Sequence, residues 1–228
     1  MTTISLPPLF NALAVNTDAF GAACAHAKQG CDAGLVTYHL GATNMQAAIV
    51  FAPEVPLHEA MAILPICGVG FQNAFGALAP PEVGIHLGWD GTIWLNGGRC
   101  GALHAACATD DPKAEPDWLV IGLDLCIWPD SEDTGHTPDQ TAMMSEGCAE
   151  VDVANLLEAW VRHTLVWINR WMDEGTAPVH KEWIGLAHGI NESVTGGGTF
   201  FGVDEHFGML VRRETDTHMV PLTNLLET

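Results

Sequence analysis

The sequence predicts an α/β (α+β) protein in which a mixed sheet is flanked by helices and followed by a small β module. Three observations lead to this prediction. Hydrophobic residues make up 48% of the 228 positions and charged residues only 16%, so the chain can bury a sizeable core. Apolar runs of strand length alternate with longer segments of helical periodicity. After residue 190 the pattern changes to short strands separated by turns.

The first third of the chain predicts a helix, two strands and a longer helical segment. Thr17 or Asp18 can cap the first helix, because its side-chain oxygen can accept a hydrogen bond from the first turn, and Gly30 ends that helix. Two apolar runs of strand length follow, GLVTYHLG and MQAAIVFAP. Pro56 then opens a longer helical segment, in which Pro65 either kinks the helix or starts a second one.

Four further strands are predicted next, and the second and third form a hairpin. Their sequences are VGIHLGW, GTIWLN, RCGALHAACAT and DWLVIGLDLCIW. Asn96-Gly97 favours a two-residue type I′ turn, because both residues accept positive φ angles. The segment Pro129–Gly147 is acidic, rich in turn residues and without a core pattern, so it predicts a long surface loop.

Two helices and a set of short strands complete the chain. Asp152 can cap a helix that ends at Gly175, and apolar residues recur along this helix at steps of three and four. A shorter helix, APVHKEWIGLAHG, follows. From Asn191 the short strands suit a small barrel-like module, which must lean on the main domain because it buries little core alone. The predicted domains are therefore residues 1–190 and 191–228.

The composition also predicts which classes of partner the protein lacks. The net charge is −20, and phosphate contacts need a basic face, so neither nucleic acid nor a membrane surface is expected as a partner. The start of the chain lacks the pattern of a signal peptide, and no uninterrupted apolar stretch of about 18 residues predicts a membrane span. Seven cysteines without a CxxC pair are typical of reduced thiols in a cytoplasmic protein, and no metal site is expected.

Arg99 and Asp124 are the first candidate functional residues. The chain has only eight lysines and arginines, yet Arg99 stands at the start of an apolar strand. Its guanidinium can pair with a surface acid, or it can donate two hydrogen bonds to a ligand carboxylate or phosphate. Asp124 lies within the apolar strand IGLDLCI and needs a donor, for which Arg99 is one candidate. His39, His86 and His104 lie on three different strands, where a lone histidine is usually a satisfied core or edge residue.

Five segments, taken in order, resemble parts of the biotin protein ligase and lipoate protein ligase superfamily. They are APEVPLHEAMAILPICGVGF, LGWDGTIWLNGGRCGALHA, DWLVIGLDLCIW, LLEAWVRHTLVWINRWMDEGTAPVHKEW and GTFFGVDEHFGMLVR. The second resembles the active-site hairpin of the ligases, and the third resembles the strand whose backbone contacts the vitamin ring system. The last resembles their small SH3-like C-terminal domain. The similarity is to a divergent bacterial branch of the superfamily.

The resemblance implies a function and a set of site residues. It implies an adenylate-forming ligase that binds a small carboxylate or acyl-adenylate near Arg99 and transfers it to a lysine of a biotin- or lipoyl-acceptor domain. Biotin or lipoate, with ATP and Mg²⁺, are the ligands that it implies. Arg99 aligns with the catalytic lysine of the family, which polarises the carboxylate and the α-phosphate. The implied ligand-binding residues are Trp89, Asp90, Asn96, Arg99, Gly101, Ala102, Leu103 and Asp124.

Two departures from the family pattern leave other functions open. No basic residue lies between Lys28 and Arg99, so the glycine- and arginine-rich loop that covers the adenylate in the family is missing, and residues 89–92 read Trp-Asp-Gly-Thr instead of Trp-Pro-Asn-Asp. One alternative is a catalytically inactive homologue that serves as an interaction module. The other is an acyl-carrier-dependent lipoyl or octanoyl transferase with Cys100 as nucleophile, although strand alternation would point Cys100 away from Arg99 and a buried Cys100 is the simpler interpretation. The acidic loop Pro129–Gly147 is a candidate cover for the site.

Overall fold

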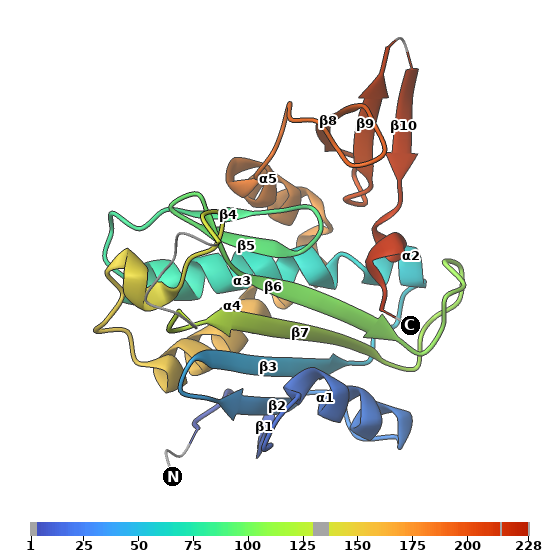
Figure 1. Cartoon of the computed structure of the whole chain (residues 1–228). Helices are drawn as coiled ribbons and strands as arrows, with labels where there is room; N and C mark the ends of the chain where they lie inside the picture. Colours follow the sequence, from blue (N-terminus) through green and yellow to red (C-terminus); the bar gives the residue numbers. More distant parts are fainter. Residues whose placement is uncertain (1–3, 130–136, 215, 228) are drawn as a thin grey trace.

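A seven-stranded mixed sheet is the largest element of the computed structural model, which describes residues 4–129, 137–214 and 216–227 (Figure 1). The strand order is β1-β2-β3-β7-β6-β5-β4. Only β1 and β2 pair in parallel, and the other neighbours are antiparallel. The strands are β1 Asn11–Ala14, β2 Leu35–Leu40, β3 Asn44–Phe51, β4 Ile85–Leu87, β5 Thr92–Leu95, β6 Gly98–Cys107 and β7 Leu119–Cys126. The predicted fold class, a mixed sheet flanked by helices, is confirmed.

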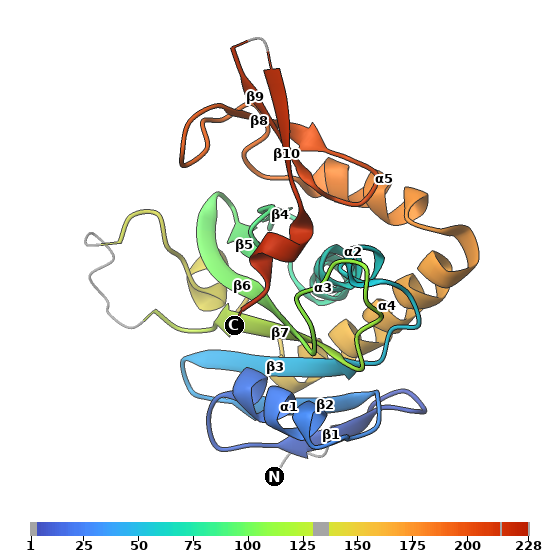
Figure 2. The ribbon, with the colours of Figure 1, turned by 90° about the vertical axis from the view of Figure 1, so that its right-hand side faces the viewer.

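Helices cover the two faces of this sheet unequally. On one face α3 packs against β6 and β7, and α4 packs on the outer side of α3 (Figure 2). On the opposite face the short α1 packs against β2, β3 and β7 and leaves much of β6 and β5 uncovered (Figure 1). The helices are α1 Ala19–Lys28, α2 Leu57–Ala60, α3 Ile63–Leu78, α4 Val153–Glu174 and α5 Ala177–Leu186.

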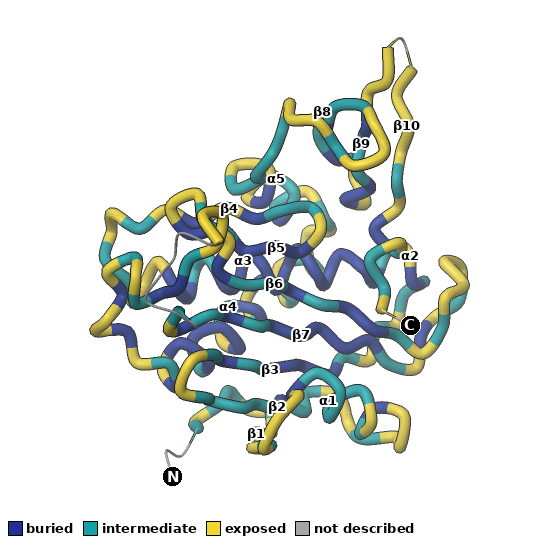
Figure 3. The backbone as a smooth tube through the Cα atoms, in the orientation of Figure 1, coloured by how far each residue is buried: buried dark blue, intermediate teal, exposed yellow. Residues whose placement is uncertain are grey.

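Alternation along the strands divides their apolar side chains between two cores. Ala47 and Ile49 of β3 face the large core under α3, whereas Ala48 and Val50 belong to a small cluster under α1. The central strands and α3 are accordingly the most deeply buried segments, as the tube in Figure 3 shows. Because β3 and β7 contribute apolar residues to both cores, these strands form the centre of the molecule.

The predicted helix caps and hairpin turn are confirmed. The Asp18 carboxylate accepts a hydrogen bond from the Gly21 amide at 2.8 Å, and Asp152 likewise caps α4. In the β5–β6 hairpin Asn96 has φ 48° and Gly97 has φ 88°, as a type I′ turn requires. Local sequence therefore determines where these elements begin and turn.

The two interpretations of Pro65 are now resolved, because the long helical segment is divided. α2 ends at Ala60 and α3 begins at Ile63, so Pro65 lies in the first turn of a second helix, where its missing N–H has no helical partner to lose. Leu57–Leu78 nevertheless reaches the length and mean hydropathy of a membrane-spanning helix, a property that a count of consecutive apolar residues misses. Within the fold 72% of its most apolar window is buried, as expected for a core helix between the sheet and α4.

The prediction of a long surface loop over Pro129–Gly147 is wrong for its second half. Ala142 and Met143 are fully buried, and residues Met143–Glu146 form a short 3-10 helix, η2. Residues 130–136 lie outside the described part of the chain. The acidic composition of the segment predicts an exposed loop, but Ala142 and Met143 are buried, and Met143 packs in the same core as Cys148.

The C-terminal residues form a small antiparallel sheet, as predicted, and then return to the large one. The small sheet has the order β10-β9-β8, with β8 Thr199–Val203, β9 Met209–Arg213 and β10 Asp216–Val220. The 3-10 helix η3, Leu222–Leu225, follows, and beyond it the tail runs beside β6, so the C-terminus lies at the large sheet (Figures 1 and 2). The boundary at residue 190 stays a prediction.

Candidate functional site: the polar face of the sheet

The sheet face that α1 covers only in part carries a row of polar side chains. Strand register places His39 opposite Gln46, Gln46 opposite Asp124, and Asp124 opposite Ala102. Residues directly opposite one another share a face, so this row crosses four strands on one side of the sheet. His104 stands two residues beyond Ala102 on β6 and therefore belongs to the same face. We call this surface the polar face.

Small residues lie where β6 and β7 pair beside the polar row. A Cβ atom at Gly101 would lie 2.2 Å from the Asp124 carbonyl oxygen, so glycine is required for the close approach of β6 and β7 there. Gly122 receives the ring of Phe20, whose nearest atom would lie 2.6 Å from a Cβ at that position. Register places Gly122 opposite His104 and Ala102 opposite Asp124, so both belong to the polar face, whereas Gly101 pairs with Leu125 and faces the large core.

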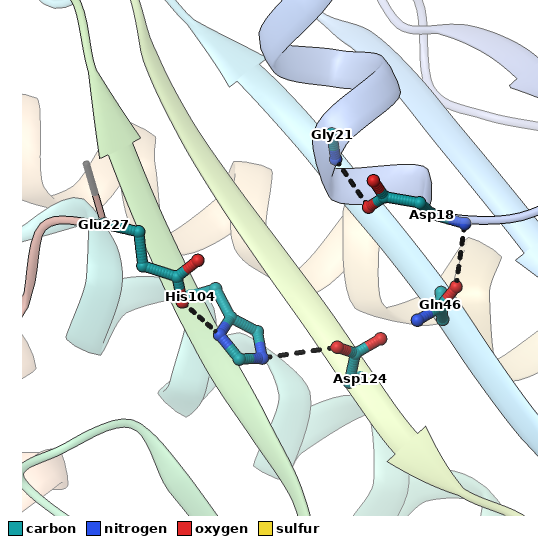
Figure 4. Close-up of polar contacts among 6 residues, drawn as sticks. All are labelled: Asp18, Gly21, Gln46, His104, Asp124 and Glu227. Atoms are coloured by element: carbon teal, nitrogen blue, oxygen red, sulfur yellow. Dashed lines mark hydrogen bonds and ion pairs between the residues drawn. The ribbon is translucent and has the colours of Figure 1, made fainter.

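His104 is the most strongly partnered side chain of the polar face (Figure 4). Its Nδ1 lies 2.6 Å from Oε1 of Glu227, and its Nε2 lies 3.3 Å from Oδ2 of Asp124. The hydrogen bond to Asp124, reinforced by Glu227 and opposed by burial, raises the pKa of His104 to about 9. His104 is therefore an imidazolium at neutral pH that donates to two carboxylates.

The N-terminus of α1 reaches the same face. The Asp18 backbone N–H donates to Oε1 of Gln46 at 3.2 Å, while its carboxylate caps the helix through Gly21 (Figure 4). Asp18 has φ 47° and ψ 69°, a left-handed conformation that is uncommon for a residue other than glycine. A strained residue held beside a polar surface is a frequent property of functional sites.

Arg99 lies at the open end of the polar face and does not pair with Asp124. Its side chain is exposed, and its guanidinium stands 5.9 Å from the centre of the Trp94 ring. Within the described residues Asp124 has His104 as its ion-pair partner, so the hypothesis of an Arg99–Asp124 pair is wrong. Register places Arg99 three residues before Ala102, which meets Asp124 directly, and this separation explains the missing pair.

Cys100 is buried, as the simpler interpretation expected. Its side chain is 2% exposed and its thiol contacts the Cys126 carbonyl oxygen at 3.4 Å. Burial raises the pKa of Cys100 well above that of a free thiol, which disfavours the thiolate that a nucleophile needs. Arg99 is exposed while Cys100 packs in the core, although a β-bulge between Ile93 and Trp94 makes Cys100 an extra residue of β6 and interrupts strict alternation there.

Asp90 and Asn96 have structural partners in the hairpin. The Asp90 carboxylate accepts a hydrogen bond from the Thr92 amide at 3.1 Å. The Asn96 side chain accepts from the Gly84 amide at 2.9 Å and donates to Glu146 at 2.7 Å. These two predicted ligand-binding residues therefore hold the turns at the two ends of β5.

Trp89 and Leu103 line a separate apolar cavity. It encloses about 320 Å³ of empty space, including its open mouth, between the start of α3, the β4–β5 turn and the C-terminal module. Its walls are largely hydrophobic and include Leu64, Leu87, Trp183 and Leu222. The predicted site residues thus divide among the polar face, the hairpin turns and the apolar cavity. Leu103 and Ala102 are separated because neighbouring residues of β6 point to opposite faces of the sheet.

Sequence reasoning missed the partners of Asp124. In the sequence His104 resembles a lone strand histidine, although it follows the predicted Ala102 by two residues and so shares its face. Glu227 lies 123 positions from His104, and no local pattern links the two. Among the described residues no group of three or more His, Cys, Asp or Glu side chains has a geometry that could hold a metal ion.

Comparison with known proteins places these features in a family context. Residues 6–185 match the model of the biotin/lipoate A/B protein ligase family, and residues 192–228 match a domain of unknown function. A biotin–[acetyl-CoA-carboxylase] ligase from Paracoccus denitrificans is 22% identical over 189 residues, which cover 79% of this chain and 78% of that protein.

Solved structures show the same fold. A biotin protein ligase-like protein of unknown function from Silicibacter sp. TM1040 is 56% identical, with a TM-score of 0.94 over 99% of this chain and 100% of that one. A mutant biotin protein ligase from Aquifex aeolicus in complex with biotin has a TM-score of 0.72 at 11% identity, over 92% and 95% of the two chains. At this low identity the second likeness shows the fold alone.

Proposed function

Because the chain belongs to the biotin/lipoate A/B protein ligase family, we propose that it binds a small carboxylic acid of the biotin or lipoate class on the polar face of its sheet. One observation carries this proposal. Polar side chains of β2, β3, β7 and β6 line up beside the small residues Ala102 and Gly122, on the face that α1 leaves partly open. A surface of this kind offers both side-chain and backbone hydrogen-bonding groups to a ligand.

The two ends of the polar face suit the two ends of such an acid. Asp124 lies on β7, against which α1 packs, and there it can meet a polar head group. Arg99 lies on β6 three residues before Ala102, the residue opposite Asp124, and so roughly 10 Å away at the usual rise of a strand. Its guanidinium can donate two hydrogen bonds to the carboxylate of the ligand. The proposed ligand therefore spans from Asp124 toward Arg99.

Activation of the bound acid by ATP and transfer to a lysine of an acceptor domain is the reaction that family membership supports. Adenylation brings two anionic reactants together, and positive charge must offset their repulsion. Arg99 supplies one charge, while Asp18, Asp124 and Glu227 outnumber His104 nearby, so Mg²⁺ is expected to supply the rest. β2 ends at Leu40 and β3 begins at Asn44, so only a short turn joins them, and we expect no basic loop there to add positive charge.

Calorimetry tests the proposed function. Wild-type protein is titrated with biotin, lipoate and octanoate, each with and without ATP and Mg²⁺. We expect saturable binding of at least one acid, and an affinity about 10- to 100-fold lower in Arg99→Ala, because a charge-assisted pair contributes about 1.5–3 kcal/mol. Arg170→Ala is the matched control, since Arg170 pairs with Glu174 on the exposed side of α4.

Each result of this titration has a defined meaning. Absence of binding to all three acids, with the fold intact, contradicts the proposal and favours the interaction module. Binding that Arg99→Ala leaves unchanged removes Arg99 from the ligand site but keeps the ligand class. The acyl-carrier-dependent transferase receives no support from Cys100, whose burial disfavours a thiolate.

A further inference from the structure

The C-terminal tail is built into the polar face. After η3, Leu226 forms a parallel bridge with Ala105 of β6, and the Glu227 amide donates to the Ala105 carbonyl at 2.8 Å. The tail thus runs beside β6 beyond Ala102, the last residue of β6 that pairs with β5. Glu227 then reaches His104 from the end of a segment that matches only a domain of unknown function.

We propose that Glu227 is a positioning residue, which holds His104 and through it Asp124, so that the C-terminal module completes the polar face. This inference rests on the proposed function, because it gives the module a part in binding the same acid. Figure 4 shows the chain of contacts from Glu227 through His104 to Asp124.

The geometry of His104 explains why a second carboxylate matters. Both ring nitrogens have a carboxylate partner, so the ring has one preferred orientation. Phe20 stands beside it, with the two ring centres 5.8 Å apart. Without Glu227 the imidazole could flip or turn away, and Asp124 would lose the donor that fixes its Oδ2.

Asp124 is the member of this unit that can meet a ligand. Its side chain is 43% exposed, and its partner His104 engages only one carboxylate oxygen. The other oxygen can accept a hydrogen bond from an N–H or O–H donor of a ligand head group. Fixing Asp124 in advance reduces the entropy lost on binding.

The backbone contacts of the tail make this arrangement reproducible although Glu227 itself is half exposed. Leu222 is buried at the apolar cavity, and Leu225 and Leu226 pack partly buried against the core. These contacts place the Glu227 backbone independently of its side chain. A substitution of the carboxylate is therefore expected to leave the module folded.

Other ionisable groups near the unit come from α1. The pKa of Cys24 is raised by burial, and its thiol feels the charges of Lys28, Asp18 and Glu227. Asp124 from β7 and Glu227 from the tail remain the groups in direct contact with His104. A change at Glu227 should thus be read most directly at His104.

Side-chain NMR titration of Glu227→Gln tests the proposal, with Glu205→Gln as control. Glu205 is an exposed glutamate of the same module, far along the chain from the tail. In Glu227→Gln we expect the His104 pKa to fall by about one unit or more, because an adjacent opposite charge is lost. In Glu205→Gln it should stay as in wild type. The same variants are then titrated with biotin, lipoate and octanoate, and Glu227→Gln should bind the wild-type ligand about 5- to 10-fold more weakly.

The two measurements separate the possible failures. An unchanged His104 titration in Glu227→Gln overturns the proposal, and so does a shifted titration with unchanged affinity. If wild-type protein binds none of the three acids, the proposed function fails, and the role of the module in ligand binding falls with it. Circular dichroism of both variants checks that the fold is retained.

Discussion

At the scale of single residues, the charge of one histidine organises the polar face. His104 is flanked by two carboxylates and by the ring of Phe20, and its side chain is 29% exposed. Its raised pKa therefore reports a stabilising interaction in the folded state, because the unfolded chain lacks these partners. Arg99, the residue that the sequence singles out first, has an aromatic neighbour instead of an acid in the described structure.

The stability that His104 provides should depend on pH in a defined direction. A group whose pKa is higher in the folded state stabilises the protein fully below its unfolded pKa of about 6.5 and ceases to do so as the pH rises through about 9. We expect wild type to exceed His104→Gln by about 1–2 kcal/mol in unfolding free energy at pH 6, after allowance for solvent screening.

Urea denaturation between pH 6 and pH 10 measures this difference. The expected result is a difference that shrinks steadily above pH 8 and is nearly lost at pH 10. His218→Gln, at an exposed position of β10, controls for the general effect of removing a histidine. A difference between wild type and His104→Gln that is the same at all pH values would contradict the assignment of the charged state.

At the scale of elements, caps and turns place the helices and strands that carry the site. α4 is the longest helix, and it supports α3 from outside the sheet. Most of its apolar side chains are buried, but Met172 in the last turn is 73% exposed. β6 borders both surfaces, since it presents Leu103 to the apolar cavity and His104 to the polar face.

Removal of the α4 cap should destabilise the protein measurably. In Asp152→Ala the Asn155 amide loses its acceptor at 2.8 Å, and the loss of such a cap typically costs about 1 kcal/mol. Thermal unfolding followed by circular dichroism should show a lower Tm. Asp173→Ala is the control, because Asp173 lies exposed in the last turn, where an acid opposes the helix dipole. Equal Tm values for wild type and Asp152→Ala would show that tertiary packing alone sets the start of α4.

At the scale of the whole molecule, contacts at two well-separated places join the small β module to the rest of the described fold. The Trp89 indole N–H donates to the Phe207 carbonyl at 2.7 Å, and Phe207 packs beside Trp183 of α5. The tail beyond η3 joins β6 at the second place. Between these places lies the apolar cavity, which separates the module from the start of α3.

Loss of the Trp89 hydrogen bond should loosen the module. We expect Trp89→Phe to lower the unfolding free energy by about 1 kcal/mol and to speed proteolysis within residues 191–227, because a buried carbonyl loses its donor. Limited proteolysis with mass spectrometry locates the cleavage. Trp128→Phe is the control, since that indole is 52% exposed. Equal cleavage rates in wild type and Trp89→Phe would show that this hydrogen bond does not hold the module in place.

Sequence patterns determined the elements of this protein because caps, turns and apolar spacing are local properties of the chain. Asp18, Asn96-Gly97 and Asp152 act on residues within a few positions, so their roles could be predicted without knowledge of the fold. Family resemblance added the class of the fold and the hairpin on which to search for a site.

Tertiary structure alone decided which side chains meet. Strand register brings Asp124 opposite Ala102 and beside His104, and the returning tail adds Glu227 from the far end of the chain. Likewise the burial of Ala142 and Met143 in an acidic segment depends on the core surface that receives them. Such contacts join residues that are distant in sequence, and their energies arise only when the sheet has formed, so no local pattern encodes them.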